Sequence, residues 1–420
     1  MDDKMPLPSP NEKQLPCLKP RTVDEAADIL RGAADDGLKL MPRGHGTRGG
    51  LGAQCHVLDA VLSTEHINSV ITYEPGDLTL TAQCGVGLAH VDEVLAEHGQ
   101  WLPLQAYRRR GTLGGLLASA ADGVLDLGYG RSRDSVLGAR VALSGGLTAQ
   151  ARGRVVKNVA GYDVPRLMVG SLGTLGLMVE VSLRVSPRPA RQSAVLMGYA
   201  SVADALLAAR HVHESPDEPV FLDLLCGACE PQLALGFDGS EERVRGSQQR
   251  AISVAESAGC TGMLILEDED CGTLRRRLDD PIAQLLPEAH GDKPAQTLMH
   301  GAVIRWSSRP SQLDDWLTMS LSTAESMGVS LRANARPGLG IGFLGIANPD
   351  EEVLSAAVRV LLKNSRRTGS AVLLAGPDSL RKTPDDVWGA PPPDIELMRR
   401  TQAALDPHRV FACGRFVGGL

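Results

Sequence analysis

The chain has 420 residues, more than one hydrophobic core usually serves, so we expect two or three packed units. Its formal net charge of −7 and the lack of any Lys/Arg block exclude the concentrated basic face that binds nucleic acid. No stretch approaches the ~20 apolar residues that span a bilayer, and the eight cysteines are scattered, so we expect a cytoplasmic protein in a reduced compartment.

The first hundred residues alternate between helical and strand patterns. Residues 22–34 repeat apolar side chains at helical spacing behind Thr22, and Gly37 ends this helix before a short strand at 38–41. Further strands are predicted at 57–62, 69–73 and 78–84, and a helix at 88–98. This alternation indicates an α+β or α/β unit.

A second alternating stretch covers residues 134–147 and 178–185, and the prolines at 187 and 189 provide an exit from it. We therefore predict a boundary near residue 190. Helical patterns follow at 202–213, 248–258, 313–327 and 351–368, interleaved with strands, and one more helix at 394–405. These patterns predict a second α+β unit and a C-terminal tail.

A glycine-rich loop follows the strand at 38–41. Gly44, Gly46 and Gly49 form a GxGxxG pattern, but a dinucleotide-binding Rossmann turn needs a helix directly after it. The continuation, residues 49–54, is too rich in glycine to propagate a helix. The alternative is an extended loop whose successive backbone N–H groups surround a phosphate.

A second glycine-rich loop is expected at residues 111–123, and its small side chains would admit a flat ring system. Two such segments in one unit favour a binding site over a plain surface turn.

Taken in this order, these segments resemble the PCMH-type FAD domain of the vanillyl-alcohol oxidase and p-cresol methylhydroxylase superfamily. Residues 129–138 and 154–176 are similar to signatures of the GlcE family, the second flavin-type subunit of bacterial glycolate oxidase. Residues 386–393 and 406–420 are similar to the C-terminus of the same family. The similar segments lie in the N-terminal half and at the C-terminus, so the resemblance extends from one end of the chain to the other.

The resemblance implies an α+β fold with three parts. Residues 15–190 would form a two-subdomain PCMH-type FAD-binding domain, residues 191–380 an α+β cap or substrate domain, and residues 381–420 a segment that packs back on the FAD domain.

The resemblance also implies non-covalently bound FAD. The pyrophosphate would be held mostly by backbone N–H groups of the first glycine loop, and the rest of the cofactor by the second segment and one strand. The implied cofactor-binding residues are Pro42, Arg43, Gly44, His45, Gly46, Thr47, Arg48, Thr112, Gly114, Gly115, Ala118, Asp122, Gly123 and Val179. Lys157 and Arg133 would either balance the diphosphate charge or serve as salt-bridged scaffold residues.

The resemblance implies a flavin subunit that works with a catalytic flavin subunit and an iron–sulfur subunit in oxidising a 2-hydroxy acid. Membrane contact would be peripheral, at the inner membrane, through these partners. A self-sufficient FAD-dependent hydroxy-acid dehydrogenase is one alternative. A scaffold subunit that has lost FAD is another, because His45, Ala120 and Ala412 stand where the family usually has other residues.

No catalytic residue can be assigned. Oxidation of a hydroxy acid needs a base and a cation for the carboxylate, yet the stretch around Asn334 and Arg336 has no histidine. His211 and His213 form an HxH pair at the end of a predicted helix and are expected at the surface. Cys226 and Cys229 form a single CxxC without a second one, which favours buried structural thiols over a metal site.

Overall fold

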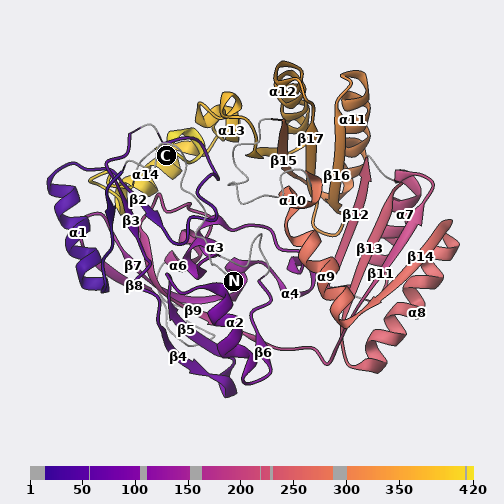
Figure 1. Cartoon of the computed structure of the whole chain (residues 1–420), viewed down its shortest axis with the longest axis horizontal. Helices are drawn as coiled ribbons and strands as arrows, with labels where there is room; N and C mark the ends of the chain where they lie inside the picture. Colours follow the sequence, from indigo (N-terminus) through magenta and orange to yellow (C-terminus); the bar gives the residue numbers. More distant parts are fainter. Residues whose placement is uncertain are drawn as a thin grey trace.

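The protein is described by a computed structural model that covers residues 15–420 except 56, 105–110, 152–162, 218, 228–229, 287–299 and 412–413. Figure 1 shows two regions side by side, with the C-terminal tail lying on the first of them. Within the described residues, no helix is both long and apolar enough to cross a bilayer.

The first region runs to residue 187. Its strands are β1 (Cys17–Leu18), β2 (Leu40–Arg43), β3 (Ala60–Ser63), β4 (Val70–Glu74), β5 (Thr79–Gln83), β6 (Gln100–Trp101), β7 (Val136–Ala142), β8 (Thr148–Ala151), β9 (Leu177–Arg184) and β10 (Ser186–Pro187). Its helices are α1 (Val23–Asp35), α2 (Leu88–Ala96), α3 (Leu113–Ser119), α4 (Asp126–Tyr129), α5 (Ser132–Ser135) and α6 (Val164–Met168).

The described strands of this region form two main sheets. The first is parallel, in the order β1-β3-β2, and the second is antiparallel, in the order β4-β5-β9-β7-β8. Helix α1 begins where the Thr22 hydroxyl accepts a hydrogen bond from the Glu25 N–H at 3.1 Å, and it buries Ala26 and Leu30. The glycine loop follows the carboxyl end of β2.

The second region is built on one antiparallel sheet. Its strands are β11 (Arg191–Tyr199), β12 (Phe221–Gly227), β13 (Gln232–Gly239), β14 (Cys260–Glu267), β15 (Gly301–Ser307), β16 (Ser330–Arg336), β17 (Ile341–Ala347) and β18 (Ser370–Ala375). In the described chain they lie in the order β14-β11-β13-β12-β16-β17-β15-β18. Both faces are covered, so β12 and β17 are apolar and buried along nearly their whole length.

Helices cover this sheet on two sides. Helices α7 (Val202–His213), α8 (Glu241–Ser257), α11 (Leu313–Ser326) and α12 (Glu351–Thr368) pack on the outer face. Helices α9 (Asp268–Asp279) and α10 (Pro281–Leu285) lie on the face turned toward the first region (Figure 1). Helix α4 of the first region also packs on β12, so this face meets the first region directly.

The tail contains α13 (Pro384–Trp388) and α14 (Ile395–Leu405). Its next residues, Val410 and Phe411, are buried in the core formed by α1, β2 and β3, and the Leu40 N–H donates to the Val410 carbonyl at 2.8 Å. This part of the tail therefore lies against the strand that leads into the glycine loop.

The α+β fold class is confirmed, and most predicted elements are present. The helices predicted at 202–213 and 351–368 have those bounds as α7 and α12. Helix α8 begins earlier than predicted, because the Ser240 hydroxyl accepts a hydrogen bond from the Arg243 N–H. The stretch 134–147 is divided by α5 and by a turn at Gly146, which has φ +76°. Helix α9 was not predicted.

Candidate functional site

The glycine loop is an irregular turn, as its composition predicts. Gly46 has φ +72° and Gly52 has φ +84°, conformations that favour glycine. Two short-range hydrogen bonds shape the turn, from the Gly49 N–H to the Gly46 carbonyl at 3.2 Å and from Leu51 to Arg48 at 3.2 Å. No helix follows the loop in the described residues before β3, so an anion bound to the loop itself would meet loop N–H groups rather than a helix dipole.

Two arginines from the distant C-terminal part hold the carbonyls of this loop. The Arg415 guanidinium donates to the Leu51 carbonyl at 2.6 Å, to the Arg48 carbonyl at 3.2 Å and to the Gly49 carbonyl. Arg381 donates to the carbonyls of residues 50 and 52. The two arginines therefore fix the carbonyls of residues 48–52, and the peptide N–H groups of residues 44–47 lie earlier in the same loop.

Those N–H groups are available to a ligand. In the part of the chain that the structure describes, the N–H groups of Gly44, Gly46 and Thr47 donate to no protein acceptor. Arg43 and Arg48 add positive charge to the same loop. The arrangement suits an anion that carries several oxygen acceptors.

The second glycine-rich segment is a helix start rather than a loop, which corrects our prediction. The Thr112 hydroxyl caps α3 by accepting from the Gly115 N–H at 3.2 Å, and Leu113, Leu116 and Leu117 are buried. The helix ends at Ala120, which has φ +43°. This left-handed conformation is costly for alanine and better tolerated by glycine or asparagine.

The loop and α3 face each other across a small cavity of ≈ 70 Å³. A Cβ built on Gly44 would overlap the Thr112 hydroxyl, so only glycine permits this approach. The cavity is lined by Met41, Pro42, Arg43, Gly44, His45, Gly46, Thr47, Arg48, Gly49, Thr112, Gly115, Ala118, Ser119, Leu172 and Arg415.

The structure therefore brings together most of the residues that the resemblance implied, although they come from segments about 70 positions apart. Gly114 lies just behind, where its N–H donates to the Cys84 carbonyl at 2.7 Å. Val179 does not line this cavity, because its side chain is buried in the core and its carbonyl accepts from the Cys84 N–H. Asp122 and Gly123 lie elsewhere, at the contact with the second region.

Sequence reasoning missed Leu172 and Arg415 on the cavity wall. Arg415 lies 364 positions from the loop carbonyl that it holds, and only the similarity of the C-terminal residues to a family tail pointed toward it. Lys157 and Ala412 lie outside the described residues. Arg133 is mostly exposed, with Asp134 at 4.0 Å, and its role stays a prediction.

Asp122 makes an ion pair across the contact between the two regions. It is buried and accepts from the Arg305 guanidinium of β15, with one contact of 2.9 Å, and Arg305 also donates to the Ser307 hydroxyl at 3.1 Å. Burial raises the pKa of Asp122, but the guanidinium beside it outweighs this effect, so the pKa lies below its usual value.

Arg336 makes a second, deeper link. It is fully buried on β16 and donates to Asp223 at 3.3 Å, to the Gly123 carbonyl at 2.9 Å and to the Leu278 carbonyl at 3.3 Å. The Val124 N–H donates to Asp279 of α9 at 3.1 Å. The segment 122–124 is therefore fixed to the second region by side chains from three of its elements.

Two further carboxyl groups of this cluster have strongly shifted pKa values. Burial raises the pKa of Asp126 to about 7 and that of Asp279 to about 7, although Arg336 nearby lowers both. Asp126 Oδ2 has no hydrogen-bond partner among the described residues. We refer to Asp122, Asp126, Asp223, Asp279, Arg305 and Arg336 as the interface cluster.

The other candidates do not form sites in the described chain. His211 and His213 are exposed at the end of α7, as predicted. Cys226 is buried on β12, whereas Cys229 lies outside the described residues. Among the residues that the structure covers, no three His, Cys, Asp or Glu side chains are grouped as metal ligands.

Comparison with known proteins identifies the first region. Residues 16–152 match the protein family described as "FAD binding domain". The chain is 32% identical over 219 residues to glycolate oxidase subunit GlcE of Escherichia coli (strain K12), which covers 52% of this chain and 61% of that protein. It is also 30% identical over 271 residues to glycolate oxidase subunit GlcD of Bacillus subtilis (strain 168). This match covers 60% of this chain and 57% of that protein.

The matched part is thus less than two thirds of each of these relatives. Among solved structures, alkyldihydroxyacetonephosphate synthase superposes with a TM-score of 0.69 over 94% of this chain and 76% of that one. Its sequence identity is 16%, so this likeness shows the fold alone.

Proposed function

We propose that this chain, whose N-terminal region carries an FAD-binding domain of the PCMH type, is the FAD-binding subunit of a 2-hydroxy-acid dehydrogenase complex of the glycolate oxidase kind. The observation that carries the proposal is the glycine loop, which lies inside the matched residues 16–152 and offers open N–H groups. The named relatives supply the class of reaction.

The residues present fit a diphosphate. A bound pyrophosphate needs hydrogen-bond donors on a backbone that it can approach closely, and the loop provides N–H groups at Gly44, Gly46 and Thr47 without side chains in the way at the two glycines. Arg43 and Arg48 would offset its charge. Thr112 and Ala118 would contact the adjoining part of the cofactor from the α3 side of the cavity.

Bound FAD would supply a redox-active ring system that can accept electrons once a partner subunit has taken them from the hydroxy acid. The protein would hold and orient the cofactor between the glycine loop, α3 and the segment 122–123. Arg305 and Arg336 would fix that segment against the second region, since Asp122 and the Gly123 carbonyl are their acceptors.

The interface cluster favours a partner-dependent subunit over a self-sufficient enzyme. A hydroxy-acid substrate needs a cation for its carboxylate. Here Arg305 is held by Asp122 and Arg336 by Asp223, so both guanidinium groups are neutralised within the chain. We infer that a catalytic partner subunit oxidises the substrate and that electrons leave through an iron–sulfur subunit.

Anaerobic mixing with glycolate separates the two functions. The FAD-loaded chain alone should keep its oxidised flavin spectrum, and adding a catalytic flavin subunit and an iron–sulfur subunit of the same source should bleach it. Rapid bleaching of the isolated chain by glycolate would instead establish a self-sufficient dehydrogenase.

A further inference from the structure

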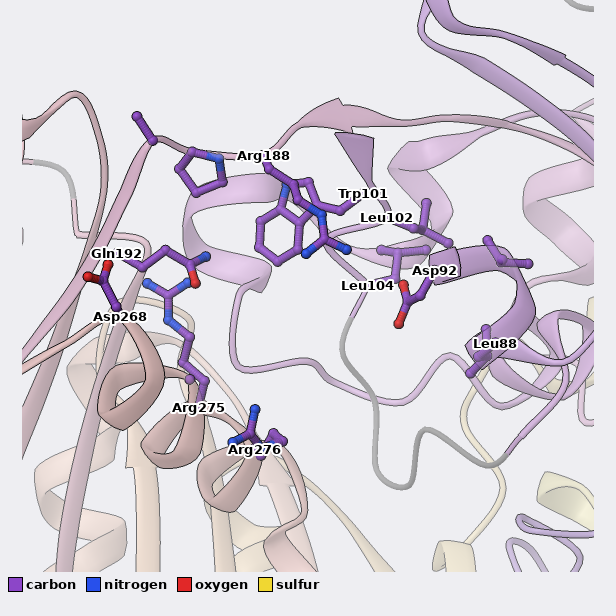
Figure 2. A pocket seen from close by; sticks show the side chains of 14 residues that line it. Leu88, Asp92, Trp101, Leu102, Leu104, Arg188, Gln192, Asp268, Arg275 and Arg276 are labelled. Atoms are coloured by element: carbon purple, nitrogen blue, oxygen red, sulfur yellow. The ribbon is translucent and has the colours of Figure 1, made fainter. Parts of the chain in front are cut away.

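A second and larger cavity of ≈ 340 Å³ lies where the two regions join (Figure 2). Its walls come from α2, from the chain after β6, from the connection at 188–192 and from α9. It shares no lining residue with the cavity at the glycine loop. Its size is in the lower range of small-molecule pockets.

One wall of this junction cavity is apolar. Leu88 and Val91 of α2 lie beside Leu102 and Leu104, and Trp101 completes the wall. The Trp101 ring is itself fixed by an edge contact with Tyr129, at 5.4 Å between centroids. This wall would hold the apolar body of a ligand and exclude water from it.

Hydrogen-bond donors also line this cavity, from Arg188 beside Trp101 and from Gln192 and Arg276 across from it (Figure 2). Arg188 is anchored by its Nε, which donates to the Gln100 carbonyl at 3.1 Å, and its terminal nitrogens have no acceptor within the described chain. Arg276 and the Gln192 amide reach the same space (Figure 2). Beneath the surface, Trp101 Nε1 and Arg275 Nε also have no acceptor among the residues described.

Acidic groups at the cavity do not cancel this excess. Asp268 is held by Arg191 at 2.8 Å, and Arg275 is paired with Asp238 below the wall. Asp92 stands on the α2 side, next to the leucines (Figure 2). Within the described chain the terminal nitrogens of Arg188 thus have no acceptor, and a ligand with an anionic oxygen pair would supply one.

We propose that the junction cavity binds a small monocarboxylate with an apolar body, its carboxylate on Arg188 and Arg276 and its body against Trp101 and the leucines. This is a separate site from that of FAD and does not rest on the proposed dehydrogenase function. Because the cavity is walled by both regions and by the connection between them, its occupant would contact both.

A substitution at Gly272 of α9 can test whether this cavity binds a ligand, because it adds a side chain to the cavity wall and removes none. A Cβ there would meet only the Arg276 side chain, at 3.5 Å, so Gly272→Leu would grow into the cavity while improving helix propensity. Gly246→Leu is the matched control, because Gly246 is also helical, meets only Arg250 at 3.3 Å and lines neither cavity.

Calorimetric titration of the FAD-saturated chain with phenylacetate provides the readout. We expect binding by the wild type and Gly246→Leu, and at least about a tenfold rise in Kd in Gly272→Leu and in Arg188→Gln. Arg277→Gln, which changes an exposed arginine on the same helix outside the cavity, should bind like the wild type. Acetate and 2-phenylethanol, which lack the body and the charge respectively, should each bind at least about tenfold more weakly.

Unchanged phenylacetate affinity in Gly272→Leu and Arg188→Gln, or no binding by the wild type, would overturn the proposal. So would loss of FAD from Gly272→Leu, since the cavity would then belong to the flavin site.

Discussion

The glycine loop and the interface cluster use charge and hydrogen bonding in opposite ways. In the loop, the carbonyls are tied by Arg415 and Arg381 while N–H groups at its start remain available. In the cluster, Arg305 and Arg336 already face carboxylates and carbonyls of the chain.

The glycine loop therefore has the features of a binding surface, whereas the interface cluster has those of a structural contact between the two regions. Open donors on a glycine backbone are available to a ligand and make no contact within the described fold, so their disruption should affect cofactor content before stability. Buried, mutually neutralised charges contribute to the folded state, so their disruption should affect stability before cofactor content. Each variant below is expected to affect one property and largely spare the other.

The largest effect is expected at Gly46. Gly46→Val places a β-branched residue at φ +72°, in the backbone stretch that would face the phosphate, and should lower FAD affinity by more than about tenfold. Flavin absorbance per chain after dialysis measures it.

Gly37→Val is the matched control, because Gly37 has φ +67° and open space around a Cβ but lies at the end of α1. It should show similar backbone strain and retain its flavin. Equal flavin loss in both variants would mean that strain alone explains the result at Gly46.

In the interface cluster, Arg336→Met should lower the free energy of unfolding by about 3 to 5 kcal/mol, because it leaves the fully buried Asp223 without its cation. Urea denaturation measures the loss. The double variant Arg336→Met/Asp223→Leu should regain much of it, since the uncompensated charge is gone. Failure of the double variant to recover stability would argue that the carbonyl contacts of Arg336 matter more than the ion pair.

Asp126 should give the cluster a pH signature. Its pKa of about 7 lies above the unfolded value, so the folded chain binds the extra proton and stability falls as pH rises from about 4 to 7. Asp126→Asn removes this cost and should raise the free energy of unfolding at pH 8 by up to about 4 kcal/mol, with little change near pH 4. A stability gain that is the same at both pH values would contradict the shifted pKa.

The smallest effect is expected at Arg415. Arg415→Met removes the donors that hold loop carbonyls and should raise the Kd for FAD by about threefold to tenfold. Arg400→Met, on the exposed side of α14, is the control and should leave the Kd unchanged. Measurement of Kd by flavin fluorescence would detect the difference, and equal values for the two variants would remove Arg415 from the account.

The parts that sequence could predict are those set by neighbouring residues. Local spacing and composition determine the helix cap at Thr22, the helices α7 and α12, and the non-helical glycine loop. The second glycine segment was misjudged because its buried leucines make it helical despite its glycines. Local patterns also gave no sign of α9.

The interface cluster could not be predicted, because the residues that bond to one another there are distant in sequence. Asp122 and Arg305 are 183 positions apart, and Gly123 and Arg336 are 213 apart. Only the folded arrangement of β15 and β16 against the segment 122–124 brings them together. For the same reason Asp122, implied as a cofactor contact, is found in an ion pair whose relation to FAD stays a prediction.

The visible absorption spectrum of the freshly purified chain, before and after acid precipitation, tests the central claim most directly. The account predicts a flavin spectrum and acid-releasable FAD at about one per chain, consistent with non-covalent binding to the glycine loop. A colourless chain that takes up no flavin on incubation with FAD would contradict it and favour a scaffold that has lost the cofactor.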